Sequence, residues 1–202
     1  MAKSRSICEY RKLRLLLVLA FIMSDLVART GRLKQRYENG YRLVAGCIPF
    51  RYRSSDVCDS NSKKIIEVLM ISSPSGPGLL FPKGGWENDE TVEEAATRES
   101  IEEAGVRGDL MGFLGYFEFR SKTHQDEFNP EGLCKAAMFA LLVKEELHTW
   151  PEQKFRNRSW LSISEAFESC RHAWMRDALD CFCKWHECGL AGTRDDFPKV
   201  TT

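Results

Sequence analysis

The 202-residue chain has no formal net charge at pH 7, because 29 Lys and Arg residues balance 29 Asp and Glu residues. A balanced chain creates no overall field that steers nucleic acid or an anionic membrane to its surface. The chain also lacks a basic stripe interleaved with aromatic residues, which would indicate nucleic-acid binding. We therefore expect no nucleic acid and no membrane as partners of the folded domain, and nothing in the sequence implies a protein partner.

The chain also lacks an apolar run long enough to span a bilayer. The run Leu15–Met23 is too short for that and follows a basic segment. The stretch Leu26–Ala28 makes a poor signal-peptidase site, whereas a basic start suits import into an organelle. We interpret residues 1–22 as a targeting segment or as an extension upstream of a start at Met23, and in neither case as part of the fold.

The eight cysteines show no clear disulfide or metal-binding pattern. A chain of this size can build a core without disulfides, and Cys47 and Cys134 lie in apolar runs, where free buried thiols are expected. Cys181, Cys183 and His186 suggest zinc at first sight, but this segment reads as helix, where residues two apart point to nearly opposite sides. We predict no zinc site and a reduced, intracellular compartment.

Size and composition, with 43% hydrophobic and 29% charged residues, predict one compact domain. A long amphipathic helix is predicted to begin at Ser164. Pro49 interrupts a predicted strand, so a bulge or a sheet edge is expected there. Residues 191–202 are expected to be a disordered tail. Strands around one helix, with a second helix near the end, suit an α/β/α sandwich with a mixed sheet. The predicted strands are residues 42–52, 65–72, 79–81, 110–120, 134–143 and 159–161.

The most informative stretch is Gly84–Val106, which reads GGWENDETVEEAATRESIEEAGV. Thr91 is expected to cap a helix over residues 92–104, with Glu94 completing a capping box. This segment contains no Gly or Pro, and Gly105 is expected to end the helix.

Three acidic residues gather on one side of this helix. Glu99 and Glu103 are four residues apart and share a face, and Glu102 lies on its flank. Crowded like charges destabilise a helix, so a cation should offset them, and Mg²⁺ or Mn²⁺ suits carboxylate ligands. A solvated acidic face is the alternative, but the acids lie near alanines and follow a glycine-rich turn, which favours the metal.

The preceding segment Pro82–Gly85 is predicted to be a turn, whose glycines let the backbone approach a ligand closely. Glu90 and Arg98 are expected to pair across the junction of loop and helix and to hold this turn in place. The alternative is an ordinary surface ion pair, which would contribute little stability.

The spacing of this stretch resembles the Nudix box, G-x5-E-x7-R-E-U-x-E-E-x-G-U, where U is an apolar residue. Ser100 departs from the pattern, because it stands at a U position. The resemblance implies the Nudix α/β/α sandwich over residues 23–190. It also implies metal-dependent hydrolysis, with Mg²⁺ or Mn²⁺, of a diphosphate linked to a further group.

The resemblance also implies roles for residues of the box. Glu99 and Glu103 are assigned as the principal metal ligands, and Glu102 as the proton acceptor and a further ligand, so that Glu102 and Glu99 are the catalytic candidates. The three glutamates are better defined as a group than by their separate roles, because family members distribute the roles of metal ligand and proton acceptor differently. The carbonyl of Gly84 would be another ligand. The structural residues of the motif would be Gly85, Glu90, Arg98 and Gly105.

Outside the box the chain resembles plant Nudix hydrolases related to the diphosphoinositol polyphosphate phosphohydrolases. The resemblance covers most of residues 23–186 and is carried by segments such as Arg29–Tyr37, Leu79–Trp86 and Cys134–Glu152. Some plant members are mitochondrial and others cytosolic, so a mitochondrial localisation is expected, with the cytoplasm as the alternative.

A highly phosphorylated substrate needs several cations near the metal site. We favour Arg51 and Lys83, although a solvated surface cation is an equal alternative at each position. Trp86 could instead stack on an adenine, as in a diadenosine polyphosphate, an ADP-ribose or a dinucleotide. A catalytically weak sensor of a polyphosphate metabolite is the alternative function, but the complete set of three glutamates favours an enzyme. The other candidate cations are Arg42, Arg120, Lys122, Lys135 and Arg158.

Overall fold

The computed structural model describes residues 34–53, 65–73, 75–121 and 129–190. The predictions for residues 1–22, for the tail 191–202 and for Lys122 lie outside these ranges. The elements are β1 (Tyr37–Glu38), β2 (Tyr41–Arg53), β3 (Ile65–Ser72), β4 (Leu79–Leu80), β5 (Lys83–Gly85), α2 (Val92–Ala104), β6 (Val106–Arg120), β7 (Leu133–Glu146), β8 (Arg158–Ser162), α3 (Ile163–Ser169) and α4 (Ala173–Leu190).

The described strands form one eight-stranded mixed sheet. Its main order is β4-β3-β2-β7-β6, while β1 and β5 pair with β2, and β8 pairs with β3. The central strands β2 and β7 run parallel, whereas β3 and β6 are antiparallel to their neighbours. The predicted mixed sheet is therefore confirmed.

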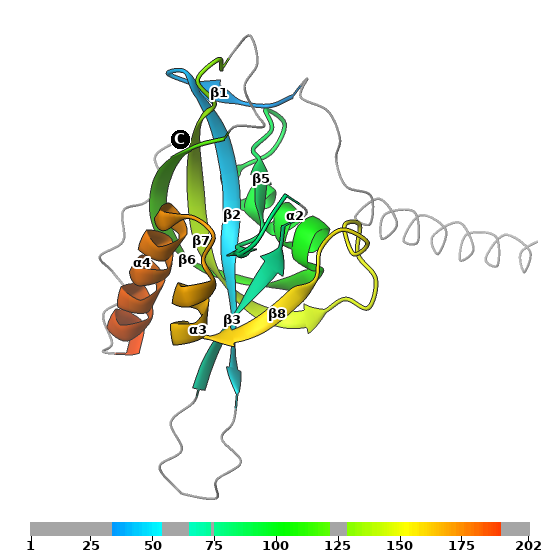
Figure 1. Ribbon diagram of the computed structural model, residues 1–202, viewed down its shortest axis with the longest axis vertical. Coiled ribbons are helices and arrows are strands. Elements are labelled where there is room, and N and C mark those ends of the chain that lie inside the picture. The colour runs from blue at the N-terminus through cyan, green and yellow to red at the C-terminus, as the bar shows by residue number, and fades with distance from the viewer. Residues whose placement is uncertain (1–33, 54–64, 74, 122–128, 191–202) are drawn as a thin grey trace, which may run out of the picture.

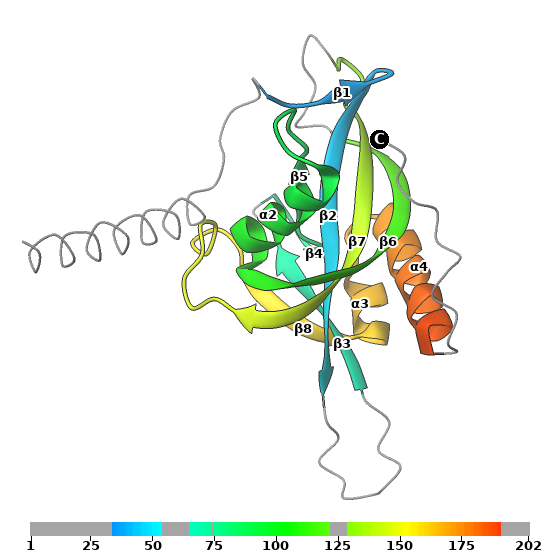
Figure 2. The same cartoon turned by 180° about the vertical axis from the view of Figure 1, so that it is seen from behind.

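Helices cover both faces of this sheet (Figures 1 and 2). On one face the Cys47 thiol donates to the Ala96 carbonyl of α2, at 3.5 Å. On the other face the Phe50 ring lies 5.2 Å from the Phe182 ring of α4. Residues an odd number apart on a strand point to opposite faces, so β2 contributes to both layers of the core. The predicted α/β/α sandwich is confirmed.

The prediction of a bulge or edge at Pro49 was wrong, because β2 lies at the centre of the sheet. It pairs with β7 from Arg42 to Phe50 in unbroken register. On its other side, the pairing of β2 with β5 stops at Gly46, and the pairing of β2 with β3 begins at Phe50. Pro49 lies between these two partners, where its missing N–H removes no bond to either strand.

The segment Pro82–Gly85 was predicted to be a turn, but its last three residues form β5. Val44 pairs with Gly85, and Gly46 pairs with Lys83. A Cβ on Gly46 would lie 2.5 Å from the Lys83 side chain, so a glycine in β2 lets the two strands meet. Gly84 and Gly85 of the box are therefore part of the sheet, where they pair with β2.

The single helix predicted from Ser164 is in fact two helices. Ser162 caps α3, with its hydroxyl accepting from the Glu165 amide and its own amide donating to the Glu165 carboxylate. After α3 the Arg171 amide donates to the Leu79 carbonyl at 3.1 Å, which ties the chain to β4 before α4 begins. This hydrogen bond between distant parts of the backbone thus interrupts the helix that the sequence pattern predicts.

The cysteine-rich segment lies on α4, as predicted. Cys181, Cys183 and Cys188 are free thiols there, as are the buried Cys47 and Cys134. None of the helices in the described part of the chain has the length and apolar character needed to cross a membrane.

Candidate active site

The helix α2 has the predicted ends. The Thr91 hydroxyl accepts from the Glu94 amide at 3.2 Å, and the Glu94 carboxylate accepts from the Thr91 amide at 2.8 Å. Gly105 ends the helix at φ 62°, a left-handed conformation that glycine adopts without strain. A Cβ on Gly105 would lie 2.6 Å from the Trp150 ring, so a larger residue would also clash with this ring. The helix therefore begins and ends where the sequence predicts.

The three glutamates expected to hold the metal are all buried. Glu99 is 8% exposed, Glu102 5% and Glu103 6%. Burial and the neighbouring Glu99 raise the pKa of Glu103 to about 8, although Lys83 and Arg156 oppose this shift. Burial raises the pKa of Glu99 as well, although Arg98 opposes it. These three carboxylates therefore do not form a solvated acidic face.

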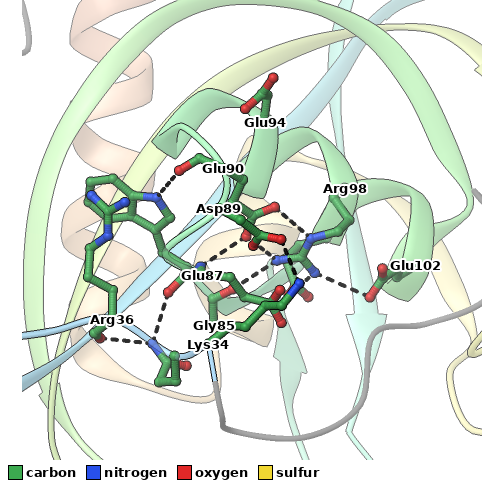
Figure 3. Close-up of polar contacts among 12 residues, drawn as sticks. Lys34, Arg36, Gly85, Glu87, Asp89, Glu90, Glu94, Arg98 and Glu102 are labelled. Carbon is green, nitrogen blue, oxygen red and sulfur yellow. Dashed lines mark hydrogen bonds and ion pairs between the residues drawn. The ribbon is translucent and has the colours of Figure 1, made fainter.

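Arg98 connects the start of the box to its end (Figure 3). Its Nε and Nη2 donate to the two carboxylate oxygens of Glu90, at 3.0 and 2.8 Å. Nη2 also donates to the Gly85 carbonyl at 2.8 Å, and Nη1 donates to Glu99 at 2.7 Å and to Glu102 at 3.3 Å. The predicted Glu90–Arg98 pair is present, and it is buried, with side-chain exposures of 5% and 14%.

Glu103 is held by β5 through one carboxylate oxygen and by Arg156 through the other. Its Oε2 accepts from the Lys83 backbone amide at 2.8 Å, which attaches α2 to β5. Its Oε1 pairs with Nη2 of Arg156, whose Nε also contacts Glu152 at 2.5 Å. The sequence did not single out Arg156, which is 53 residues away.

Gly84 lies directly against the box carboxylates. A Cβ on Gly84 would lie 2.2 Å from the Glu99 carboxylate, so any side chain here would displace that carboxylate. A Cβ on Gly85 would likewise lie 2.2 Å from the Gln35 amide. The glycines thus bring the β5 backbone and the α2 carboxylates together.

Ser100, the departure from the box pattern, is fully buried and satisfied. Its hydroxyl donates to the Ala96 carbonyl at 2.9 Å, one helical turn earlier. A small residue with this bond occupies the apolar position without an unpaired polar group.

These donors fit a hard divalent cation in chemical type. Glu99, Glu102 and Glu103 supply carboxylates, and the β5 backbone at Gly84 leaves no space for a side chain beside them. In the described part of the chain, no three His, Cys, Asp or Glu side chains are already arranged as a metal site. Arginines hold the box carboxylates instead.

The candidate phosphate-binding cations differ in their surroundings. Arg51 pairs with Glu67 at 2.8 Å and with Glu146 at 3.1 Å, and it stacks on Trp160. Arg120 is exposed and lies 3.3 Å from Glu131. Both cations therefore already contact carboxylates.

Lys83 and Arg42 lie nearer the box. Burial lowers the pKa of Lys83, while Glu103 opposes this shift, and Arg42 and Lys83 repel each other. The Arg42 Nε is buried and has no hydrogen-bond partner among the described residues. These two cations are the better placed for an anionic substrate.

Three further candidates have structural contacts. Arg158 donates to the carbonyls of Ala104 and Gly105, at 3.2 and 2.9 Å, so it caps the C-terminal end of α2. Trp86 has Arg36 stacked on its ring at 4.1 Å, and its indole N–H donates to the Glu90 carbonyl. Lys135 lies 4.8 Å from the Tyr116 ring centre.

The fold and the box together define a Nudix hydrolase. The family model for the NUDIX domain matches residues 52–182, and the chain belongs to this family of enzymes, which act on phosphoanhydrides and generally use divalent metals. The chain is 74% identical over 168 residues to "Nudix hydrolase 16, mitochondrial" of Arabidopsis thaliana, covering 82% of this chain and 93% of the relative. This name agrees with the predicted mitochondrial localisation.

Two other matches are more distant. The chain is 34% identical over 132 residues to diphosphoinositol polyphosphate phosphohydrolase 3-alpha of Mus musculus, covering 64% of this chain and 69% of the relative. A solved structure of a C. elegans Ap4A hydrolase binary complex is similar in fold, with a TM-score of 0.51 and 21% identity, covering 75% of this chain and 98% of the other.

Proposed function

We propose that this Nudix hydrolase cleaves a diphosphate linkage in a nucleoside diphosphate derivative or a diphosphoinositol polyphosphate, with Mg²⁺ or Mn²⁺ as its cofactor. The observation that carries the proposal is the burial of Glu99, Glu102 and Glu103 on one helix beside Gly84. Three buried carboxylates are unfavourable without cations, and an anionic substrate would add to this need.

In this proposal Glu99, Glu103 and the Gly84 carbonyl hold the divalent cation. When bound, such a cation polarises phosphoryl oxygens and lowers the pKa of a bound water. Glu102 accepts the proton of the attacking water as general base, and also serves as a further ligand. Arg98 fixes the orientation of Glu99 and Glu102 through its contacts with Glu90 and Gly85.

Lys83 and Arg42 are proposed to bind the phosphates, because both lie near the box and neither side chain is in ion-pair contact with a carboxylate of the described residues. Arg51, Arg120 and Lys122 are proposed as further contacts for a highly phosphorylated substrate. Arg51 and Arg120 would exchange their present carboxylate partners for phosphate. The names of the Mus musculus relative and of the C. elegans enzyme motivate testing inositol and dinucleotide substrates.

We also propose that the domain extends over residues 23–190, beyond the matched 52–182, because β1 and β2 begin before this match and α4 ends after it. Residues 1–22 would then direct the protein to mitochondria, as the name of the Arabidopsis relative suggests. The tail 191–202 would lie outside the fold.

The test is turnover by the full chain, with Mg²⁺ and with Mn²⁺, of diphosphoinositol polyphosphates, diadenosine polyphosphates, ADP-ribose and NADH. Glu102→Gln and Glu103→Gln are the matched inactive variants, and Glu145→Gln, an exposed acid outside the box, is the control. We expect metal-dependent turnover of one substrate class by the wild type and the control, with loss of roughly 100-fold or more in both box variants.

The same experiment separates the enzyme from a sensor. Tight metal-dependent binding of one compound without turnover by the wild type would support a binding module. Turnover that survives in both box variants would contradict the assignment of these carboxylates.

A further inference from the structure

Arg156 bridges two carboxylates at the far end of the box. Its guanidinium pairs with Glu103 through Nη2 and with Glu152 through Nε. Arg156 and Glu103 are buried, with side-chain exposures of 14% and 8%, whereas Glu152 is 30% exposed. When Glu103 is ionised, its buried carboxylate requires such a partner, and Arg156 then balances its charge.

The segment that carries Arg156 is attached to α2 independently of this ion pair. The Leu147 amide donates to the Gly105 carbonyl at 2.8 Å, and the Glu152 amide donates to the Glu102 carbonyl at 3.1 Å. The Arg156 amide in turn donates to the Glu152 carbonyl at 3.0 Å. The backbone therefore keeps Arg156 near the box even when its side chain moves.

The two arginines of the box differ in how firmly they are held. Arg98 donates twice to buried Glu90 and once to the Gly85 carbonyl, so it keeps its place without Glu99. Arg156 has the partly exposed Glu152 carboxylate as its other ionic partner, and its Nη1 donates to the Ser72 carbonyl at 3.5 Å. Arg156 can therefore leave Glu103 at a smaller cost than Arg98 can leave Glu99, by turning toward Glu152 and solvent.

A divalent cation ligated by Glu103 would need the same carboxylate that Arg156 now contacts. Two cations at one carboxylate repel each other strongly inside a protein. We propose that Arg156 is the resident counter-cation of Glu103, that divalent metal displaces it, and that it then remains paired with Glu152 alone. This inference rests on the proposed metal site, and it assigns Arg156 a positioning role that the box motif does not contain.

The test is Mn²⁺ binding to the full-length protein without substrate, measured by calorimetry for the wild type and for Arg156→Met. Methionine keeps the apolar bulk of the side chain and removes the competing charge. We expect Mn²⁺ to bind roughly tenfold or more tightly to Arg156→Met. Arg107→Met is the matched control, because Arg107 pairs with Glu145, at 3.4 Å, outside the box. Its Mn²⁺ affinity should equal that of the wild type.

Hydrogen exchange gives a second readout, which separates this role from a merely structural one. Because the backbone bonds of this segment do not depend on the ion pair, the Phe155 and Arg156 amides should exchange equally fast in the wild type and in Arg156→Met, with and without Mn²⁺. Faster exchange in Arg156→Met would show that Arg156 holds the segment in place, and would overturn the inference.

The outcomes separate this inference from the proposed function. Equal or weaker Mn²⁺ binding by Arg156→Met would overturn the counter-cation role and leave the metal site standing. Failure of the wild type to bind Mn²⁺ would overturn both. Should Arg156→Met not fold, Arg156→Lys replaces it, because lysine lacks the fork that spans Glu103 and Glu152. It should bind Mn²⁺ more tightly than the wild type, and unchanged affinity would again overturn the inference.

Discussion

Arg98 and Glu90 form a two-point ion pair across eight residues, with nitrogen–oxygen distances of 3.0 and 2.8 Å. The pair joins the loop before α2 to the middle of the helix (Figure 3). It is buried, so it differs from an exposed ion pair, which contributes little. Through the Gly85 carbonyl, the same guanidinium also fixes β5 against the helix.

Replacing Arg98 by Gln should destabilise the protein by about 3–5 kcal/mol, because it removes the guanidinium that pairs with the buried Glu90 carboxylate. Urea unfolding followed by circular dichroism measures this loss. Arg107→Gln is the control, since the Arg107 pair with Glu145 is more exposed, and its effect should stay within about 0.5 kcal/mol. Equal stabilities of the two variants would contradict a structural role for Arg98.

Gly84→Ala should lower turnover by roughly 100-fold or more, because a Cβ would displace the Glu99 carboxylate from its place beside β5. Turnover with saturating Mn²⁺ is the measurement. Gly189→Ala is the matched control, because α4 has open space at Gly189 and alanine favours helix. Wild-type activity in Gly84→Ala would show that the close approach has no role in catalysis.

The stability of the metal-free protein should depend on pH through Glu103. Burial and Glu99 raise the folded-state pKa of Glu103 from its ordinary value of 4.5 to about 8. Between these values the folded state binds more protons than the unfolded state, so the free energy of unfolding falls as the pH rises. Thermal unfolding from pH 5 to about pH 8.5, with a chelator present, tests this.

The matched variant for this pH dependence is Glu103→Gln, which cannot ionise. We expect its stability to fall less over the same range than that of the wild type. Identical pH profiles would show that Glu103 is not the group responsible. Metal binding near pH 7 should also release a proton from Glu103, which calorimetry in buffers of different ionisation enthalpy detects.

Arg158→Met should destabilise the protein by roughly 2–4 kcal/mol, because three backbone carbonyls lose a charged donor. The KM for substrate should change little, because this guanidinium caps α2 and is not proposed to bind phosphate. Urea unfolding and steady-state kinetics together test the assignment. A large rise in KM at unchanged stability would favour the phosphate-binding alternative.

The local signals of the box predicted α2 correctly. The Thr91 cap, the Glu94 capping box and the Gly105 stop are all present, because these interactions lie within a few residues of the chain. The Glu90–Arg98 pair could be predicted for the same reason. The strand β3 also matches its prediction, since its apolar run is bounded by polar segments.

Features that depend on distant partners could not be predicted. The glycines of β5 have low strand propensity, and only pairing with β2 makes them a strand. The break between α3 and α4 follows from the bond between Arg171 and the Leu79 carbonyl. Arg156 reaches Glu103 across 53 residues, so no local pattern indicates it.

The proposed hydrolysis depends most directly on whether the glutamates of α2 bind the metal. We would measure Mn²⁺ binding by calorimetry to the wild type, to Glu103→Gln and to Glu67→Gln, a buried acid that pairs with Arg51 outside the box. We expect the wild type and Glu67→Gln to bind with equal affinity, and Glu103→Gln to bind roughly tenfold or more weakly. Equal affinity in all three proteins would contradict the assignment of the metal site to α2.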